Sequence, residues 1–246
     1  MHHAALVIVL ISSLSACCSQ AESPAKSSIA PVTGSITGTI RFLGNLKPPR
    51  PPVPRPTCDG KPIDPARLET LLLGEGRTMA GVYVAVKSGL GGRAFHAPAE
   101  PAILKHVGCI YEPRVLAVMA GQPIIARSLD KEMHAVHLSP TVNPVFGRPQ
   151  PTKGVEFEVL FSLPELAIPA KCDVHPWERA WIHVSDHPYS AVTRSDGKYS
   201  IKELPPGDYE ILAWHERFRH SQLVAKVTVV AGMTSILDFT FEGQDP

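Results

Sequence analysis

Short runs of alternating apolar and polar residues recur along most of the chain, and this period of two predicts β-strands. The run 34–42 alternates in this way, and 82–86 reads as a second strand. Further strands are predicted at 102–105, 115–119, 123–128, 134–138, 154–160 and 181–185. Turn residues separate these segments at the intervals typical of a sandwich or barrel.

The last third of the chain has its own pattern of strands and turns. Strands are predicted at 191–193, 199–201, 209–214, 224–230 and 235–241. Asp196-Gly197 is typical of a hairpin turn, and Pro205-Pro206-Gly207 is typical of a second turn. Together with Thr193 and the run Leu204 to Tyr209, this pattern resembles the carboxypeptidase-regulatory-like family of small transthyretin-like β-sandwiches. That resemblance implies an accessory module, and strand 34–42 resembles the opening strand that completes it.

Helix is expected at one short segment. Asp64 and Pro65 supply an N-cap and a proline at the first helical position, and good helix formers follow at 66–73. The proline-rich stretch 48–56 cannot pair within a sheet. With 25 prolines and 18 glycines, the chain favours many short segments over long helices.

The N-terminus reads as an export signal. The apolar core 6–14 is far shorter than the roughly 20 residues of a spanning helix. Leu14-Ser15-Ala16-Cys17 resembles the lipobox of bacterial lipoproteins, and this resemblance implies a lipid on Cys17. Position 18 is not Asp, which resembles the sorting pattern of lipoproteins on the periplasmic side of the outer membrane. A plain secretory peptide cut near Ala21 is the alternative, and both export the protein. Residues 18–34 then form a tether.

Charge and motif content exclude several classes of function. The 24 Lys and Arg nearly balance the 23 Asp and Glu, so neither a nucleic-acid partner nor an electrostatic membrane surface is expected. Membrane contact is expected through the lipid anchor alone. The sequence has no Ser-His-Asp order, phosphate loop or dinucleotide-binding glycine motif, which leaves hydrolytic and nucleotide-dependent chemistry without support.

Cysteine pairing is informative in an oxidising compartment. If Cys17 carries lipid, four of the five cysteines remain, and they allow three pairings. Cys58 and Cys109 both lie in turn-like contexts next to glycine, so we predict that they form a disulfide. Cys172 is then free, and metal ligation is one explanation for a free thiol in an exported protein.

The run Cys172-Asp173-Val174-His175 is the sharpest candidate for chemistry. A thiolate and an imidazole three residues apart can reach one metal from a tight turn, and this pair of donors suits copper or zinc. The motif is weak alone and gains weight from a third ligand on a distant strand. The segment around His134 and His137 offers that ligand.

Four linked motifs follow in the order of a known family. They are Tyr111-x-Pro113, Gly121-Gln122-Pro123, His134-x-Val136-His137 and Cys172-x-x-His175-Pro176. The sequence resembles the blue-copper cupredoxins, most closely the short-loop amicyanins, and is closer still to bacterial cupredoxin-like proteins, some labelled methylamine utilisation proteins. The bacterial cupredoxin-like proteins also contain segments that correspond to residues 186–189 and 213–216 of this chain. The resemblance therefore covers about residues 105–242. It implies one copper ion held by His134, Cys172 and His175.

Two positions depart from the family pattern. Glu178 stands where the axial methionine is expected, and Ala135 replaces the asparagine that commonly follows the first histidine. A hard, charged carboxylate stabilises Cu(II) over Cu(I) and lowers the reduction potential. Glu178 is therefore a candidate fourth ligand. Cupredoxin-like proteins with a Glu ligand have red rather than blue sites, and the same is expected here if Glu178 binds the metal.

Other interpretations of these residues stay open. Cys172 can instead form a disulfide with Cys109 or Cys18, and Glu178 can be a solvated loop residue. Alternation along the strand puts His137 on the face opposite His134, where packing or solvent is expected. Among the remaining histidines, structural or bracing roles are expected for His183, His187 and His215, and no partner pattern is found for His96 and His106.

The sequence therefore predicts an all-β protein with a cupredoxin-like Greek-key sandwich, a small transthyretin-like sandwich and one short helix. The expected divisions are a leader 1–17, a tether 18–34, an N-terminal β segment 35–104, a cupredoxin-like domain 105–187 and a regulatory-like domain 188–246. The first hypothesis is copper binding with electron transfer or copper handling for a protein partner. The others are a non-metal binding or structural module with a decayed site and, with least support, a copper enzyme.

Overall fold

The computed structural model describes residue 1 and residues 32–45 and 57–243. The expected leader with Cys17, residues 18–31 of the expected tether and the connector 48–56 lie outside the described residues. The described residues from Val32 onward form one compact unit. In the described part of the chain, no helix is both long and apolar enough to cross a membrane.

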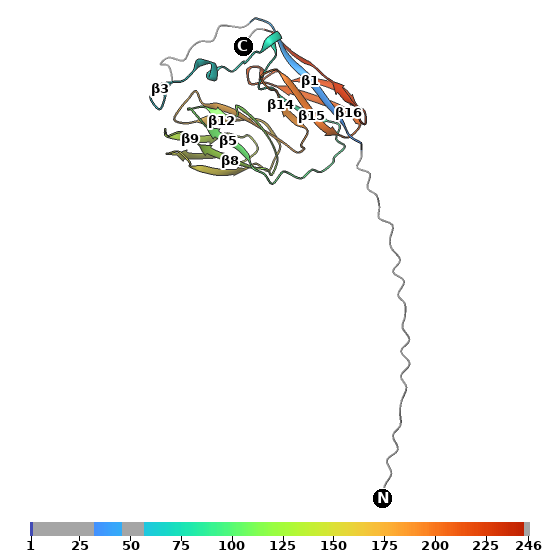
Figure 1. The fold of residues 1–246 in the computed structure, drawn as a ribbon, viewed down its shortest axis with the longest axis horizontal. Coiled ribbons are helices and arrows are strands. Elements are labelled where there is room, and N and C mark those ends of the chain that lie inside the picture. The colour runs from blue at the N-terminus through green and yellow to red at the C-terminus, as the bar shows by residue number, and fades with distance from the viewer. Residues whose placement is uncertain (2–31, 46–56, 244–246) are drawn as a thin grey trace. The chain divides into compact units, whose positions relative to one another are not determined.

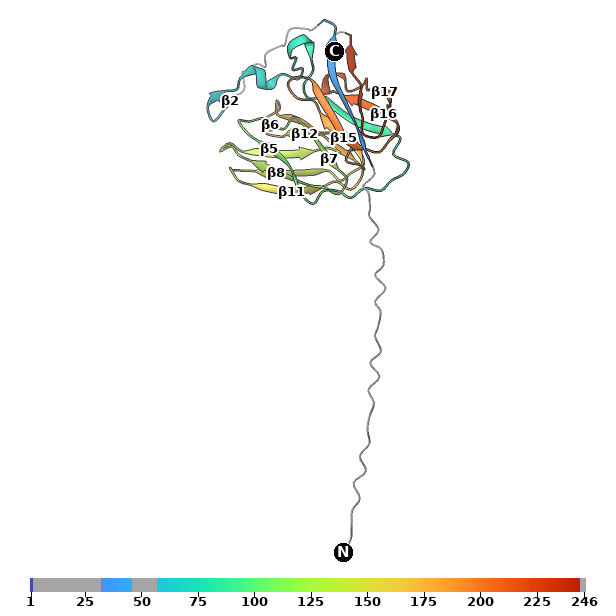
Figure 2. The same ribbon diagram turned by 45° about the vertical axis from the view of Figure 1, so that its right-hand side comes forward.

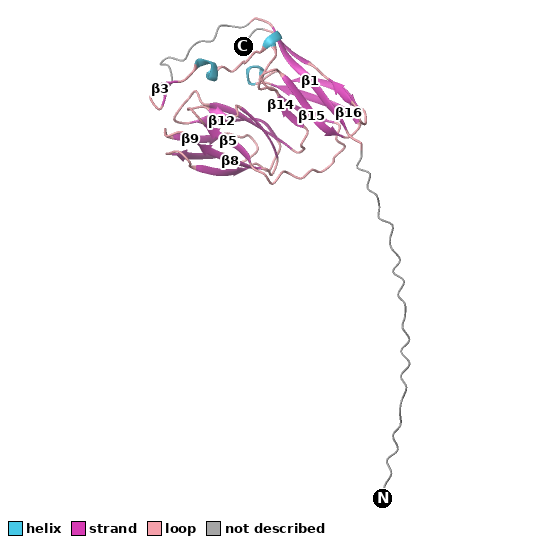
Figure 3. Ribbon diagram, in the orientation of Figure 1, coloured by secondary structure: helices cyan, strands magenta, loops and turns pink. Residues whose placement is uncertain are grey.

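The described residues form an all-β structure of two sandwiches (Figures 1 and 3). The central sandwich holds the middle of the chain, and Figure 2 labels several of its strands. One of its sheets consists of β10 (Phe146–Gln150), β9 (His134–Leu138), β12 (Glu165–Cys172), β13 (Arg179–Ser185) and β7 (Val115–Met119), in that order. The other consists of β11 (Glu156–Leu160), β8 (Pro123–Ser128), β5 (Ala102–His106) and β6 (Tyr111–Glu112).

The terminal sandwich combines both ends of the described chain. One sheet has β1 (Gly34–Leu43) between β15 (Lys198–Leu204) and β18 (Thr234–Ile236), with β19 (Phe239–Glu242) also paired to β1. The other sheet consists of β14 (Ser190–Val192), β4 (Tyr83–Ser88), β16 (Gly207–Trp214) and β17 (Leu223–Val229). The pairing of β1 with β15 confirms that the first strand completes the C-terminal sandwich. The N-terminal β segment expected at 35–104 is therefore divided between the two sandwiches. Strands β1 and β4 belong to the terminal sandwich, and β5 belongs to the central one.

Each sandwich closes around its own apolar core, because alternate residues of facing strands point inward. Ile36, Ile40 and Phe42 of β1 fill the terminal core. Leu104, Ile124 and Val136 are among the residues that fill the central core, which also contains Cys172. Cys172 therefore lies at the edge of a packed interior rather than on the surface.

Tight backbone packing fixes how β18 and β19 run beside β1. An ideal Cβ on Gly38 would lie 1.8 Å from the carbonyl oxygen of Leu237, so only glycine fits at this point of β1. The backbone amide of Leu237 donates to Thr37 there. The single strand predicted at 235–241 is consequently two short strands that meet at this contact.

Helical structure is shorter than the sequence predicted. Instead of a helix over 66–73, one 3₁₀ turn covers Pro65–Leu68, with the Asp64 carboxylate accepting from the amide of Ala66 as an N-cap should. The chain turns to an extended conformation at Glu69. Leu71 and Leu73 pack against the terminal core, and this burial outweighs the local helix preference. The remaining described helical turns are Glu75–Arg77 and Glu216–Phe218, and a small hairpin joins β2 (Thr57–Cys58) and β3 (Lys61–Pro62).

Aromatic side chains pack the two sandwiches against each other. Tyr83 and Trp214 from the terminal sandwich pack with Trp181 from the central sandwich. The ring of His183 stacks on Tyr83 at 4.0 Å and meets Trp214 edge-on at 4.6 Å. Glu216 ties the interface further, because it pairs with Arg114 and accepts from the indole of Trp181 at 3.1 Å. His183 is therefore structural, as the sequence suggested.

Candidate metal centre

Strand pairing brings the two ends of the candidate site together. β9 and β12 are antiparallel neighbours, with Cys172 opposite Val136, so His134 at the start of β9 lies beside the end of β12. Cys172 is the last residue of β12, and the loop to β13 carries His175 and Glu178. A turn in that loop, closed by the amide of Glu178 donating to the carbonyl of His175 at 3.0 Å, aims both side chains back at the strands.

Four donor atoms from the predicted ligands converge on one point. The Nδ1 atoms of His134 and His175 lie 3.2 Å apart. The sulfur of Cys172 lies 3.9 Å from the first of these nitrogens and 3.8 Å from the second. Oε1 of Glu178 lies 3.1 Å from Nδ1 of His134 and 2.8 Å from Nδ1 of His175. The structure thus brings together all four residues that the sequence proposed as ligands.

These spacings fit ligands arranged around one small ion. Metal–nitrogen bonds of about 2.0–2.1 Å and metal–sulfur bonds of about 2.3 Å put neighbouring ligand atoms about 3.3–3.8 Å apart. The nitrogen–nitrogen separation of 3.2 Å and the nitrogen–sulfur separations of 3.8 and 3.9 Å lie close to that range, and the carboxylate contacts are shorter. Oε1 of Glu178 is buried and has no hydrogen-bond partner, so a cation would satisfy it. The donor set therefore fits a copper-type metal.

The sulfur of Cys172 is held by the backbone beside it. The amide of Ala135 lies 3.4 Å from this sulfur and donates to it. The amide of Asp173 also donates to the carbonyl of Ala135 at 3.3 Å. Because both contacts use the main chain, the replacement of the usual asparagine by Ala135 leaves this support in place. The thiolate is the form of cysteine that binds metals.

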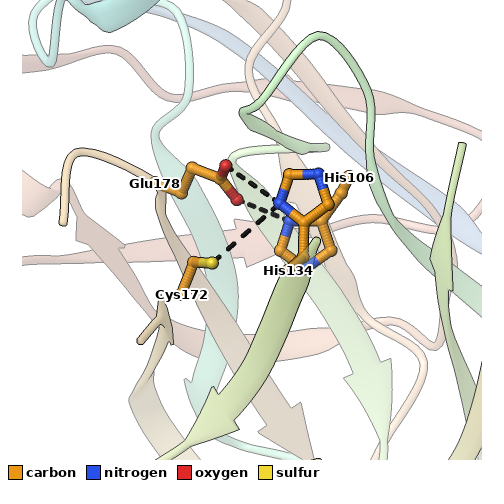
Figure 4. A group of neighbouring side chains, drawn as sticks. All are labelled: His106, His134, Cys172 and Glu178. Atoms are coloured by element: carbon orange, nitrogen blue, oxygen red, sulfur yellow. Dashed lines mark hydrogen bonds and ion pairs between the residues drawn. The ribbon is translucent and has the colours of Figure 1, made fainter. Parts of the chain in front are cut away.

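A fifth residue belongs to the site and was missed in the sequence. His106, the last residue of β5, is fully buried, and its Nδ1 lies 2.6 Å from Oε2 of Glu178 (Figure 4). Its ring also stacks on that of His134, with centroids 4.3 Å apart. The two carboxylate oxygens therefore have separate roles, since Oε2 contacts His106 while Oε1 faces the other imidazoles. A lone histidine at a strand end gives no local signal of this contact.

Burial and charge set the protonation states of the site. Burial lowers the pKa of His134, but the hydrogen bond with Cys172 and the contacts with Glu178 outweigh it and raise this pKa to about 10. Burial raises the pKa of Glu178, but the hydrogen bond with His106 and the charges of His106 and His134 outweigh it and lower this pKa to about 2. For His106, burial lowers the pKa. Glu178 is therefore a carboxylate at neutral pH, which is the form that binds cations.

The disulfide predicted from the sequence lies next to this site. Cys58 and Cys109 are bonded, with a Cα–Cα distance of 5.5 Å, and Cys172 is a free, buried cysteine. The carboxylate of Asp130 accepts from the amides of Gly108 and Cys109 at 2.7 and 2.9 Å. Its Oδ2 also lies 3.2 Å from Nε2 of His134, so Asp130 connects the disulfide turn to the candidate ligand.

The other histidines lie away from the converging donors. His137 points to the other side of β9 and pairs with Asp173 at 2.9 Å, as alternation predicted. His96 is exposed. His187 donates from Nε2 to the carbonyl of Val86 at 2.8 Å, and His215 accepts from the amide of Arg217 at 3.3 Å, so both brace backbone segments.

Comparison with protein families gives one match. Residues 183–241 match the model of the second β-sandwich domain of NOMO1-like BOS complex subunits. The match overlaps the small sandwich predicted at 188–246 and covers less than half of the chain. No curated protein matches this chain.

Several solved structures are partly similar to the chain. A copper-containing nitrite reductase from Thermus scotoductus SA-01 is 21% identical with a TM-score of 0.33, over 40% of this chain and 25% of the reductase. A purple cupredoxin from Nitrosopumilus maritimus is 22% identical with a TM-score of 0.30, over 34% of this chain and 99% of that one. A copper(I) amicyanin variant is 18% identical with a TM-score of 0.31, over 42% and 98%.

These similarities are partial. The chain spans about a quarter of the length of the nitrite reductase, and the TM-scores of these three structures do not exceed 0.33. At that level, overall similarity says nothing about the chemistry of this chain. The assignment of the site therefore rests on the geometry of its own side chains.

Proposed function

We propose that this chain is an exported, copper-binding protein of the cupredoxin type that carries electrons or copper to a protein partner. The observation that carries the proposal is the convergence of the donor atoms of His134, Cys172, His175 and Glu178. Two imidazoles and a thiolate suit copper, and the carboxylate adds a hard fourth donor. Copper bound there supplies one-electron chemistry between Cu(II) and Cu(I).

The surroundings of the donors support a carrier rather than an enzyme. The side chains of His134 and Glu178 are 0% exposed, and that of His175 is 12% exposed. Burial leaves little room for a substrate beside the donors, whereas one partly exposed imidazole suffices for electron exchange with a partner. Packing of Cys172 into the central core holds the thiolate in one position.

The carboxylate gives this proposed site a character different from a blue-copper centre. Glu178 is anionic and buried, so its charge favours Cu(II) over Cu(I) and lowers the reduction potential. We therefore propose a low-potential centre closer to the red type. The resemblance of residues 14–17 to a lipobox supports the proposal of a lipid anchor on Cys17 and a location on the periplasmic side of the outer membrane.

Copper titration of protein purified from an exporting host tests the proposal. The metal-free protein receives Cu(II), and the expected result is an intense thiolate-to-copper absorption band at one copper per chain. Cys172→Ser should abolish the band, since serine keeps the size of the side chain without the sulfur. His96→Ala is the matched control, because that imidazole is exposed and away from the site.

Absence of the band, or its survival in Cys172→Ser, would overturn the proposal. A disulfide at Cys172, seen by mass spectrometry of the oxidised protein, would favour the non-metal binding module, because a bridged sulfur is no thiolate ligand. Binding of azide to the copper-loaded protein would favour the enzyme, because it requires an open coordination position.

A further inference from the structure

The disulfide sulfur of Cys109 lies within reach of the same donor atoms as the candidate copper ligands. Donor atoms of Cys109, His134, His175 and Glu178 all lie within 4.8 Å of one another. Cys109 is 0% exposed, and the unpartnered Oε1 of Glu178 faces this group from a fully buried side chain. The Cys109 sulfur is bonded to Cys58 in this structure, and a disulfide sulfur is a poor metal ligand compared with a thiolate.

We propose that the Cys58–Cys109 disulfide is a redox gate on the metal centre. Its reduction frees the Cys109 thiolate as a sulfur donor beside His134, His175 and Glu178, so that the reduced protein holds ions that favour thiolate ligands, Cu(I) or Zn²⁺. This inference rests on the proposed function, because it uses the same His134 and His175. A thiolate with two imidazoles and a carboxylate is a donor set that binds such ions.

Hydrogen bonds hold the backbone of Cys109 independently of the disulfide. Its amide donates to Asp130 at 2.9 Å, and its carbonyl accepts from the indole of Trp177 at 3.0 Å. Asp130 also accepts from Gly108, and Arg67 donates to the carbonyl of Val107 at 2.9 Å. The thiolate released by reduction would therefore stay beside the site.

Cys58 is held much less firmly, and this asymmetry directs the reduction. It lies partly exposed on the two-residue strand β2, whose described strand partner is the equally short β3. A dithiol reductant therefore reaches the Cys58 sulfur and attacks it, which breaks the S–S bond and expels Cys109 as the thiolate leaving group. The second thiol of the reductant then frees Cys58. The reductant becomes a disulfide, having supplied two electrons and two protons, of which one goes to Cys58 and the other to the solvent because Cys109 leaves as the thiolate.

A matched pair of variants isolates the Cys109 thiol. Cys58→Ser and Cys109→Ser both remove the disulfide, but only the first leaves a thiol beside the site. Both are made together with Cys172→Ser, so that the thiolate of the proposed copper site is absent, and Co²⁺ is the probe. Sulfur-to-cobalt absorption is expected in the double variant Cys58→Ser/Cys172→Ser. It should be absent from the double variant Cys109→Ser/Cys172→Ser. Equal absorption in the two double variants, or absorption in neither of them, would overturn the proposal.

Alkylation of the unmutated protein gives a second measurement that does not depend on how the variants fold. After reduction with a dithiol, added Zn²⁺ should lower the alkylation of Cys109 relative to the reduced, metal-free protein and leave that of Cys58 unchanged, as read by mass spectrometry. Labelling of Cys109 that is the same with and without Zn²⁺ would contradict the gate. The oxidised, unmutated protein tests the proposed function separately, since its copper band depends on Cys172 and requires no free Cys109.

Discussion

Nδ1 of His106 lies 2.6 Å from Oε2 of Glu178, and both side chains are fully buried. One residue ends strand β5 and the other lies in the loop after β12, 72 positions later. The contact fixes the carboxylate so that its second oxygen faces Nδ1 of His134 and His175. Residues that orient a metal ligand in this way contribute to affinity without touching the ion.

Removal of the His106 contact is expected to weaken metal binding. His106→Phe keeps a ring against His134 but loses the bond to Glu178, and the affinity for Cu(II) should fall about 10–100-fold. His106→Gln, whose amide can donate, should recover part of the loss. Competition titration against a chelator measures the affinities. His96→Phe, at an exposed position, should match the unmutated protein, and an unchanged affinity in His106→Phe would contradict this role.

Replacement of the carboxylate by the thioether of the family pattern is expected to raise the reduction potential. Glu178→Met removes a buried negative charge beside the metal, so Cu(I) gains stability relative to Cu(II). The absorption spectrum should shift from red-type towards blue-type. Voltammetry and visible spectroscopy measure the two effects. Glu156→Met changes a carboxylate on the exposed strand face and should leave both unchanged; a potential unaltered by Glu178→Met would exclude Glu178 as a ligand.

Bound copper is expected to stabilise the folded protein. The site joins β9, β12 and the loop after it, so the unfolded chain loses the arrangement that binds the ion. At free metal 1,000 times the dissociation constant, the gain is about 4 kcal/mol. Thermal unfolding before and after chelation measures it. Cys172→Ser should show a much smaller difference, and a melting temperature insensitive to chelation in the unmutated protein would argue against a specific site.

Stability is expected to fall with acidification because of His183. Burial between the sandwiches lowers the pKa of His183 to about 3, from 6.5. The unfolded state therefore binds more protons below pH 6.5, and stability declines as pH falls from there towards 3. Between pH 7 and pH 5 this single residue should remove about 2 kcal/mol.

Urea unfolding at several pH values tests this dependence. His183→Asn keeps an acceptor for the Ala167 amide, which donates to Nδ1 at 3.2 Å, and does not titrate. The variant should show a flatter stability curve between pH 7 and pH 5. His215, whose pKa burial lowers to about 4, contributes a similar slope and remains in both proteins. Parallel curves for the two proteins would contradict the assignment to His183.

Local patterns predicted most of the strands because the side-chain period of a half-buried strand is visible in the sequence. β7, β8, β9 and β13 all lie where alternation indicated them. β12 was missed. It contains Pro169, and its register against β13 shifts at a left-handed Ala167, so its sequence does not alternate cleanly. β10 was missed because four of its five residues are at least partly exposed and one of them is Pro149.

The sequence by itself determined the order and identity of the candidate ligands, because Cys172, His175 and Glu178 lie within one short loop and His134 lies in a recognisable motif. The tertiary structure alone decided that His106 contacts Glu178 and that the Cys58–Cys109 disulfide lies beside the same donors. The reason is physical. These contacts join residues far apart in the chain, and they depend on how the two sheets of the central sandwich close around a shared core, which no local periodicity encodes.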